Sequence, residues 1–162
     1  MKKLKVTIIG YGGMGSFHAK LIQANPEVEV HGIFDISESR QQAGEADGYS
    51  AYASLEEALN DACADTILIA TPNDVHKEIA VQALEAGKHV ICEKPVTLTS
   101  EELSEIMNTA EEQGRVFMVH QNRRWDSDFQ MVKDLYEKRK IGEIFHIESR
   151  VQGANGIPGD WR

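Results

Sequence analysis

The sequence predicts an α/β fold, a doubly wound parallel sheet of the Rossmann type. Apolar runs rich in β-branched residues alternate along the chain with stretches of helical periodicity, which is typical of βαβ units. The first apolar run leads directly into a glycine loop that opens a helix, as in the first βα unit of that fold. The chain has 162 residues, 41% of them hydrophobic, so it is long enough to bury one hydrophobic core.

The individual strands and helices follow from these patterns. Strands are predicted at residues 4–9, 29–34, 66–70, 89–93 and 115–120, with a weak one near 49–52. Helices are predicted at residues 13–24, 54–60, 74–86, 100–114 and 127–140. Ser54 and Glu57 form a capping-box pattern at the start of one helix, and Gly87 and Gly114 end two others.

The segment after Gly142 departs from this alternation of strands and helices. The residues "EIFHIESRV" alternate between two faces, which predicts a long strand at 143–151 outside the parallel sheet. An unpaired strand of that length invites pairing with another chain. We therefore expect a homo-oligomer, with residues 143–151 as its contact.

The charge balance limits the classes of partner. The chain carries 17 basic and 26 acidic residues, a net charge of -9, so its field repels nucleic-acid phosphates and anionic lipids. No apolar run approaches the roughly 20 residues of a membrane helix, and the first residues lack the apolar core of a signal peptide. A cytoplasmic protein is expected, with neither nucleic acid nor membrane as partner. Cys63 and Cys92 lack metal-ligand spacing and are interpreted as reduced core thiols, and no metal site is predicted.

The glycine loop has the pattern G-x-G-x-x-G between a strand and a helix, the context in which this motif binds a dinucleotide. It consists of Gly10, Tyr11, Gly12, Gly13, Met14 and Gly15. Gly10 allows the tight turn, Gly12 lets a pyrophosphate approach the backbone, and Gly15 lets helix and strand pack closely. The helix N-terminus offers N–H groups to the phosphates. All six residues are therefore assigned to a cofactor site.

An acidic residue supports this assignment. Asp35 follows the second strand about 20 residues after Gly15, where a carboxylate accepts hydrogen bonds from the adenosine ribose. It would repel a 2'-phosphate, so NAD is favoured over NADP, although Arg40 keeps NADP open; Ile36 and Arg40 are assigned to the same site. In the alternative reading the glycines only form a turn and Asp35 caps a helix near Ser37. A weaker alternative is a methyltransferase site for S-adenosylmethionine.

Further motifs carry a family resemblance. They are Thr71-Pro72-Asn73 with His76, Glu93-Lys94-Pro95, Asn122-Arg123-Arg124-Trp125 and the closing Gly159-Asp160-Trp161-Arg162. In this order, and with the glycine loop, they closely resemble the Gfo/Idh/MocA family of oxidoreductases, which includes glucose-fructose oxidoreductase and inositol dehydrogenase. The resemblance implies hydride transfer between a nicotinamide and a hydroxyl-bearing carbon, usually of a sugar or cyclitol.

The resemblance also implies roles for single residues. Lys94, at the carboxyl end of a strand, would stabilise the substrate oxygen on which charge develops, and Glu93 would lie near the nicotinamide ribose. The alternative is an exposed ion pair at a strand end. Thr71, Pro72 and Asn73 end another strand and should line the cofactor cleft. The cofactor assignment also includes Lys94 itself, His76, which is equally well read as a surface residue of a helix start, and Asn122.

Members of this family are longer than the present chain. We therefore expect a dinucleotide-binding domain at residues 1–122, and at 123–162 a connecting helix and the start of a truncated substrate and oligomerisation domain. The proton-relay residues implied by the resemblance would lie past Arg162, so the chain alone is expected to be nearly inactive. A natural truncation and a cut chain both fit. The competing functional hypothesis is a non-catalytic NAD-binding module used for sensing or assembly.

Overall fold

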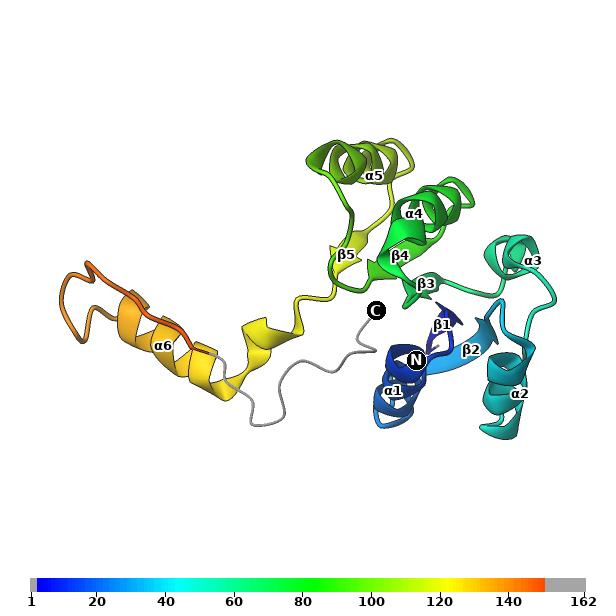
Figure 1. Cartoon of the computed structure of the whole chain (residues 1–162), viewed down its shortest axis with the longest axis horizontal. Helices are drawn as coiled ribbons and strands as arrows, with labels where there is room; N and C mark the ends of the chain where they lie inside the picture. The colour runs from blue at the N-terminus through cyan, green and yellow to red at the C-terminus, as the bar shows by residue number, and fades with distance from the viewer. Residues whose placement is uncertain (1–2, 151–162) are drawn as a thin grey trace. The chain divides into compact units, whose positions relative to one another are not determined.

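The computed structural model describes residues 3–150, which form two compact units (Figure 1). The first unit runs up to His120 and the second starts at Gln121. This division lies close to the domain boundary expected after residue 122. Each unit is described by itself below.

A five-stranded parallel sheet forms the centre of the first unit and confirms the predicted fold class. Its strand order is β2-β1-β3-β4-β5, and every neighbouring pair is parallel. The strands are β1 (Leu4–Ile9), β2 (Val28–Phe34), β3 (Thr66–Ile69), β4 (His89–Cys92) and β5 (Phe117–Val119). Each lies within or close to a predicted apolar run.

Helices connect the strands and cover both faces of the sheet. They are α1 (Gly13–Gln23), α2 (Glu38–Ala46), α3 (Leu55–Asn60), α4 (His76–Glu85), which follows the 3-10 turn η1 (Asn73–Val75), and α5 (Ser100–Glu112). The capping pattern predicted for α3 is present, because the Glu57 N–H donates to Ser54 Oγ at 3.1 Å. A capping box between Thr99 and Glu102 starts α5.

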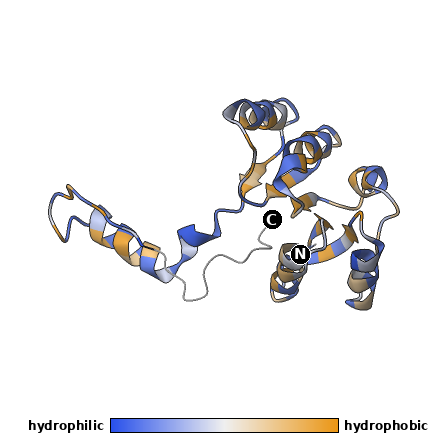
Figure 2. Cartoon of the chain, viewed as in Figure 1, coloured by the Kyte–Doolittle hydropathy of each residue, from blue (hydrophilic) through white to orange (hydrophobic). Residues whose placement is uncertain are grey.

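The hydrophobic core consists of two clusters, one on each face of the sheet. Successive side chains of a strand point to opposite faces. Val6 and Ile8 accordingly pack in one cluster with Ala19 of α1, whereas Ile9 joins a second cluster with Leu84 of α4. Figure 1 shows α1 and α2 on one side of the sheet and α3, α4 and α5 on the other, and Figure 2 shows the apolar residues concentrated in the strands between them.

The strand order creates a switch point between β1 and β3. The chain leaves β1 toward one edge of the sheet, reaches β2, and then crosses back to β3 on the other side of β1. In open parallel sheets, ligands bind beyond the carboxyl ends of the strands at such a point, and this strand order has its switch point between β1 and β3. The fold therefore places a crevice between the loop after Ile9 and the loop after Ile69.

Three sequence-based predictions differ from the structure. The weak strand at 49–52 is wrong: Ala51 makes one isolated bridge to Ile33, and the chain then turns toward the cap of α3. Residues 144–150 carry no strand, because a strand needs a hydrogen-bonding partner and none lies beside this segment in the part of the chain that is described; residue 151 lies outside the described residues. Cys63 is exposed, whereas Cys92 is buried as predicted.

The second unit contains the 3-10 turn η2 (Asn122–Trp125) and helix α6 (Ser127–Glu137). Helix α6 ends before the predicted residue 140, and its last turn is followed by Arg139, which has a φ of 50°. None of the helices within residues 3–150 combines the length and apolar character needed to cross a membrane. The prediction of an oligomer contact in this unit stays a prediction.

Candidate functional site

Two glycines of the loop after β1 are required by the fold itself. Gly10 has a φ of +90°, and a Cβ atom there would meet the backbone of Ala70 at 2.8 Å. A Cβ atom on Gly15 would lie 2.0 Å from the carbonyl oxygen of Gly10. Gly10 thus makes the turn beside β3, and Gly15 lets α1 start directly against the loop, as the motif predicts.

Gly12 and Gly13 differ from these two, because the protein does not fill the space beside them. A Cβ atom on Gly12 would have the Arg40 side chain as its nearest neighbour, at an ordinary 3.5 Å, and one on Gly13 would meet nothing within 4 Å. Gly12 is also the N-cap of α1, whose first turn carries no acidic side chain. The loop therefore leaves room for a phosphate at a helix N-terminus, which attracts anions.

Asp35 follows β2 and is buried, with 3% of its surface exposed. Its Oδ2 accepts the N–H of Tyr11 and its Oδ1 accepts the N–H of Ser37, both at 2.8 Å. The carboxylate thus holds the glycine loop against the start of α2. Since each carboxylate oxygen can accept more than one hydrogen bond, this structural role leaves acceptor capacity for a ribose hydroxyl.

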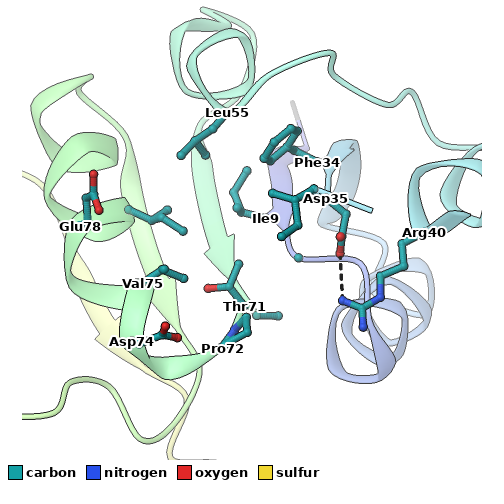
Figure 3. A pocket seen from close by; sticks show the side chains of 14 residues that line it. Ile9, Phe34, Asp35, Arg40, Leu55, Thr71, Pro72, Asp74, Val75 and Glu78 are labelled. Atoms are coloured by element: carbon teal, nitrogen blue, oxygen red, sulfur yellow. Dashed lines mark ion pairs between the residues drawn. The ribbon is translucent and has the colours of Figure 1, made fainter. Parts of the chain in front are cut away.

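A cavity of about 430 Å³ opens beside Asp35 (Figure 3). Its walls come from the ends of β1, β2 and β3 and from the start of α4, and they include Phe34, Leu55 and Val75. Ile36 also lines this cavity and is 94% exposed. The cavity lies at the switch point and is mostly apolar, with Asp35 on one wall, which suits an adenosine group.

Arg40 of α2 lies between the loop and the acid. Its Nη1 is 3.5 Å from Asp35 Oδ2, the ion pair drawn in Figure 3, and about half of the side chain is exposed. The guanidinium also borders Gly12. It therefore stands beside the space in which the ribose and pyrophosphate of a dinucleotide would lie.

The side chains of Tyr11 and Met14 point to different surroundings. The Tyr11 ring is buried in the core, and its hydroxyl donates to Asp47 Oδ2 at 2.8 Å. Burial and the Asp47 carboxylate raise the pKa of Tyr11. Tyr11 can therefore meet a ligand only through its backbone, whereas Met14, in the first turn of α1, is exposed.

The segment after β3 faces the same cavity. Thr71 and Pro72 line it, and the Thr71 hydroxyl is buried without a hydrogen-bond partner among the described residues. Asn73 starts η1. An orphaned buried hydroxyl at a strand end fits a polar group of a ligand, because such groups are otherwise paired.

His76 has a different environment from the one expected for a cofactor residue. It is fully buried, and its ring nitrogens lie 2.9 Å from the Thr71 carbonyl oxygen and 3.1 Å from the Pro95 carbonyl oxygen. The imidazole thus connects the loops after β3 and β4. Its ring nitrogens face these two backbone carbonyls, and its assignment to the cofactor site stays a prediction.

Glu93 and Lys94 follow β4 and differ in burial. Lys94 is exposed, and its N–H donates to Glu93 Oε2 at 3.1 Å. Glu93 is 6% exposed, and its Oε1 contacts His18 Nε2 at 2.7 Å and His120 Nδ1 at 2.9 Å. The interpretation of Glu93 and Lys94 as an exposed ion pair is wrong, because the glutamate is buried among histidines.

The pKa of Glu93 reflects this environment. Burial acts to raise it, but the hydrogen bonds from His18 and from the Lys94 N–H, together with the nearby charge of His120, lower it below its ordinary value. The carboxylate is therefore ionised at neutral pH. A buried, ionised glutamate joined to two histidines is a cluster that the sequence motifs do not reveal.

His18 and His120 are the site residues that sequence reasoning missed. His18 lies on α1, 75 positions before Glu93, and His120 follows β5, 27 positions after it. Their rings meet edge to face, with centroids 4.6 Å apart. Their positions in the sequence could have indicated this. His18 lies on the helix that the glycine loop opens and His120 directly follows a parallel strand, so both approach the same edge of the sheet.

Comparisons with known proteins agree with this geometry. The profile of the Gfo/Idh/MocA family, described as "Oxidoreductase family, NAD-binding Rossmann fold", matches residues 4–121. The chain belongs to this family. The predicted resemblance is thereby confirmed, and the dinucleotide fold with it.

Two curated relatives illustrate the range of the family. The uncharacterized oxidoreductase YdgJ of Escherichia coli is 40% identical over 147 residues, which is 90% of this chain and 42% of the relative. The scyllo-inositol 2-dehydrogenase (NADP(+)) IolW of Bacillus subtilis is 34% identical over 142 residues, or 87% of this chain and 39% of the relative. The chain thus spans less than half the length of these relatives.

Solved structures give the same picture. An NAD-binding protein from Listeria innocua is 57% identical, with a TM-score of 0.93 over 99% of this chain and 48% of that chain. GenD2 from gentamicin A biosynthesis, solved in complex with NAD, is 29% identical, with a TM-score of 0.82 over 86% of this chain and 40% of that one.

Asn122 lies at the start of η2, in the second unit. Its assignment to the cofactor site stays a prediction, as do the individual ligand contacts of the other assigned residues.

Gly15→Ala should destabilise the protein by about 3 kcal/mol, because its Cβ would overlap the Gly10 carbonyl oxygen and force the start of α1 away from β1. Gly13→Ala is the matched control. Its Cβ meets nothing, so it should be neutral or stabilise by up to about 1 kcal/mol. Urea unfolding followed by circular dichroism measures both, and equal stability of the two variants would contradict the packing described for Gly15.

Gly12→Val should abolish dinucleotide binding while leaving the fold intact. The protein tolerates a side chain at this position, but the added carbons would occupy the space beside the helix N-terminus. We expect NAD affinity to fall by roughly 100-fold, as for the loss of a phosphate site worth about 3 kcal/mol. Titration calorimetry on the folded variant makes the measurement; normal NAD binding would show that the loop is not the site.

Proposed function

We propose that this protein is the cofactor-binding part of an NAD-dependent oxidoreductase that transfers hydride to or from a hydroxyl-bearing carbon of a sugar or cyclitol. The observation that carries the proposal is the alignment of three strand ends at one edge of the sheet: the glycine loop after β1, the cavity beside Asp35, and Lys94 after β4. The named inositol dehydrogenase among its relatives supports the substrate class.

The residues present suit a dinucleotide at both ends. Gly12 leaves a cradle at the N-terminus of α1 that an added side chain would fill, and Asp35 borders an apolar cavity. The Thr71 hydroxyl has no hydrogen-bond partner among the described residues, and Thr71 lines the same cavity as Asp35. When bound, the nicotinamide would supply the acceptor or donor of the hydride. The protein would then hold the adenosine half and the nicotinamide half of the cofactor at separate, fixed positions on rigid strand ends.

Asp35 should make NAD the preferred cofactor. A carboxylate that faces a phosphate dianion costs about 1–3 kcal/mol in a partly solvated site, so NADP should bind roughly 5- to 150-fold more weakly than NAD. Arg40, 3.5 Å from Asp35, would offset part of this repulsion. Arg40→Ala should therefore weaken NADP binding further and change NAD binding little. Titration calorimetry decides, and equal or tighter binding of NADP by the unmodified chain would refute the assignment.

Lys94 is the proposed catalytic residue. Lys94 is an exposed residue just after the carboxyl end of β4, and its backbone N–H is held by Glu93. A cation at that place can hydrogen-bond the substrate oxygen on which negative charge develops when hydride leaves the adjacent carbon. Turnover also requires groups that orient the substrate and a group that accepts its proton. None of the described residues is assigned to these two roles.

Lys94→Ala should lower kcat by about 100- to 1,000-fold, the usual effect of removing one oxyanion-stabilising donor. The assay is NADH formation from a panel of inositols and sugars by the longest form of the protein that its gene encodes. NAD affinity should fall far less than kcat in the variant. The 162-residue chain alone should remain near the detection limit, and robust turnover by it, or an enzyme indifferent to Lys94→Ala, would place the catalytic centre elsewhere.

A further inference from the structure

The carboxylate of Glu93 receives hydrogen bonds from three separate parts of the fold. We propose that Glu93, held by His18 and His120, is a positioning residue that fixes the backbone of Lys94 and so aims its ammonium at the substrate oxygen. The inference rests on the proposed function of Lys94 and adds to it a second set of residues, the positioning cluster of His18, Glu93 and His120.

Glu93 supports the end of β4 through both its backbone and its side chain. The Glu93 N–H donates to the Ile69 carbonyl oxygen at 2.9 Å, which extends the pairing of β4 with β3 by one residue. At the next residue, the N–H of Lys94 donates to Glu93 Oε2 at 3.1 Å. The side chain of Glu93 therefore continues the support of the chain where regular strand pairing gives way to the loop.

The two histidines fix the glutamate in turn. His18 Nε2 reaches Oε1 from α1 at 2.7 Å, and His120 Nδ1 reaches the same oxygen from the end of β5 at 2.9 Å. Neutral imidazoles suffice for both bonds, provided that each ring carries its proton on the nitrogen facing the glutamate. Helix α1 is thus connected, through the carboxylate of Glu93, to the residue directly before Lys94.

The backbone on the other side of Lys94 is also held. Pro95 presents its carbonyl oxygen to His76 Nδ1 at 3.1 Å, and His76 Nε2 lies 2.9 Å from the Thr71 carbonyl oxygen. The Lys94 side chain itself is exposed. A fixed backbone that carries an exposed cation is the arrangement expected of a residue that must meet a ligand at a set place.

Packing alone does not account for the choice of residues. A buried carboxylate is stabilised only when its charge is met by donors, and an apolar side chain would fill the same volume without that requirement. Here Glu93 is buried, and its three donors are a backbone N–H and two histidines. The cluster is therefore suited to fixing the backbone conformation of the neighbouring residue, Lys94.

The first test measures the hydrogen bond on the 162-residue chain by amide hydrogen exchange with NMR. In Glu93→Ala the exchange of the Lys94 amide should rise about tenfold, because its acceptor is gone. The amide of residue 93, which bonds to Ile69, should keep its protection. Glu57→Ala is the matched control: it removes a carboxylate that accepts the Ala53 N–H at 2.9 Å, and it should leave the Lys94 amide unchanged.

The second test uses kinetics of the longest gene-encoded form. Glu93→Gln, His18→Leu and His120→Leu should each lower kcat by about 10- to 100-fold, the scale of a misplaced catalytic group. In the two histidine variants, whose residues are not assigned to the cofactor site, the Kd of NAD should change less than about twofold. His18→Gln and His120→Asn retain a donor near the replaced nitrogen and should restore most of kcat. A role in stability alone would predict no such rescue at equal folded fraction.

The outcomes separate the two proposals. If Lys94→Ala abolishes turnover but the cluster variants keep normal kcat, the positioning inference is overturned and the catalytic assignment stands. If Lys94→Ala has no effect, the proposed function of Lys94 fails first. The three side chains are also of a type that binds metal ions, so calorimetry with Zn²⁺ is included: tight binding lost in His18→Leu would overturn positioning in favour of a metal site.

Discussion

The parallel pairing of β1 with β3 is the constraint on which the rest of the structure depends. Ile9 is aligned with Ile69, so the loop after β1 and the loop after β3 leave the sheet at the same level. Gly10 then lies so close to Ala70 that no side chain fits between them. Because β2 lies on the other side of β1, the crevice for a ligand must open at this point.

Two buried carboxylates accept backbone N–H groups at strand ends on the two sides of this crevice. A strand that ends in a functional loop loses the hydrogen bonds of the ladder, and its N–H groups need other acceptors. Asp35 accepts N–H groups from the glycine loop and from the start of α2, and Glu93 accepts the N–H of Lys94. Both acids thus order backbone beside the proposed cofactor and substrate sites. A substitution at either is therefore expected to affect loop geometry as well as charge.

The first unit contains the elements predicted for a dinucleotide site, whereas the match to this chain covers only 42% of YdgJ and 39% of IolW. In the proposed function, cofactor binding uses groups close to the sheet, namely the loop, Asp35 and the strand ends. Substrate orientation needs walls on the far side of the nicotinamide. Cofactor preference can therefore be measured on the 162-residue chain itself, whereas turnover should be measured on the longest form of the protein.

The sequence by itself determined what local spacing controls. The strand-glycine-helix order, the acid about 20 residues on, the caps at Ser54 and Gly87, and the alternation of apolar residues all act within one or two elements. These features sufficed for the fold class and the family, and they are the basis of the predicted cofactor site. They also placed Lys94 at a strand end, since a proline after a buried strand stops pairing.

Only the tertiary structure decided features that depend on partners far apart in the chain. His18 and Glu93 are 75 positions apart, and no periodicity links them. His76 has the sequence of a surface helix start, yet two loops enclose it. The segment at 49–52 has strand-like residues but pairs through one bridge. A local pattern states which conformations a segment can adopt, whereas burial and strand pairing are set by the surfaces that the remaining chain brings against it.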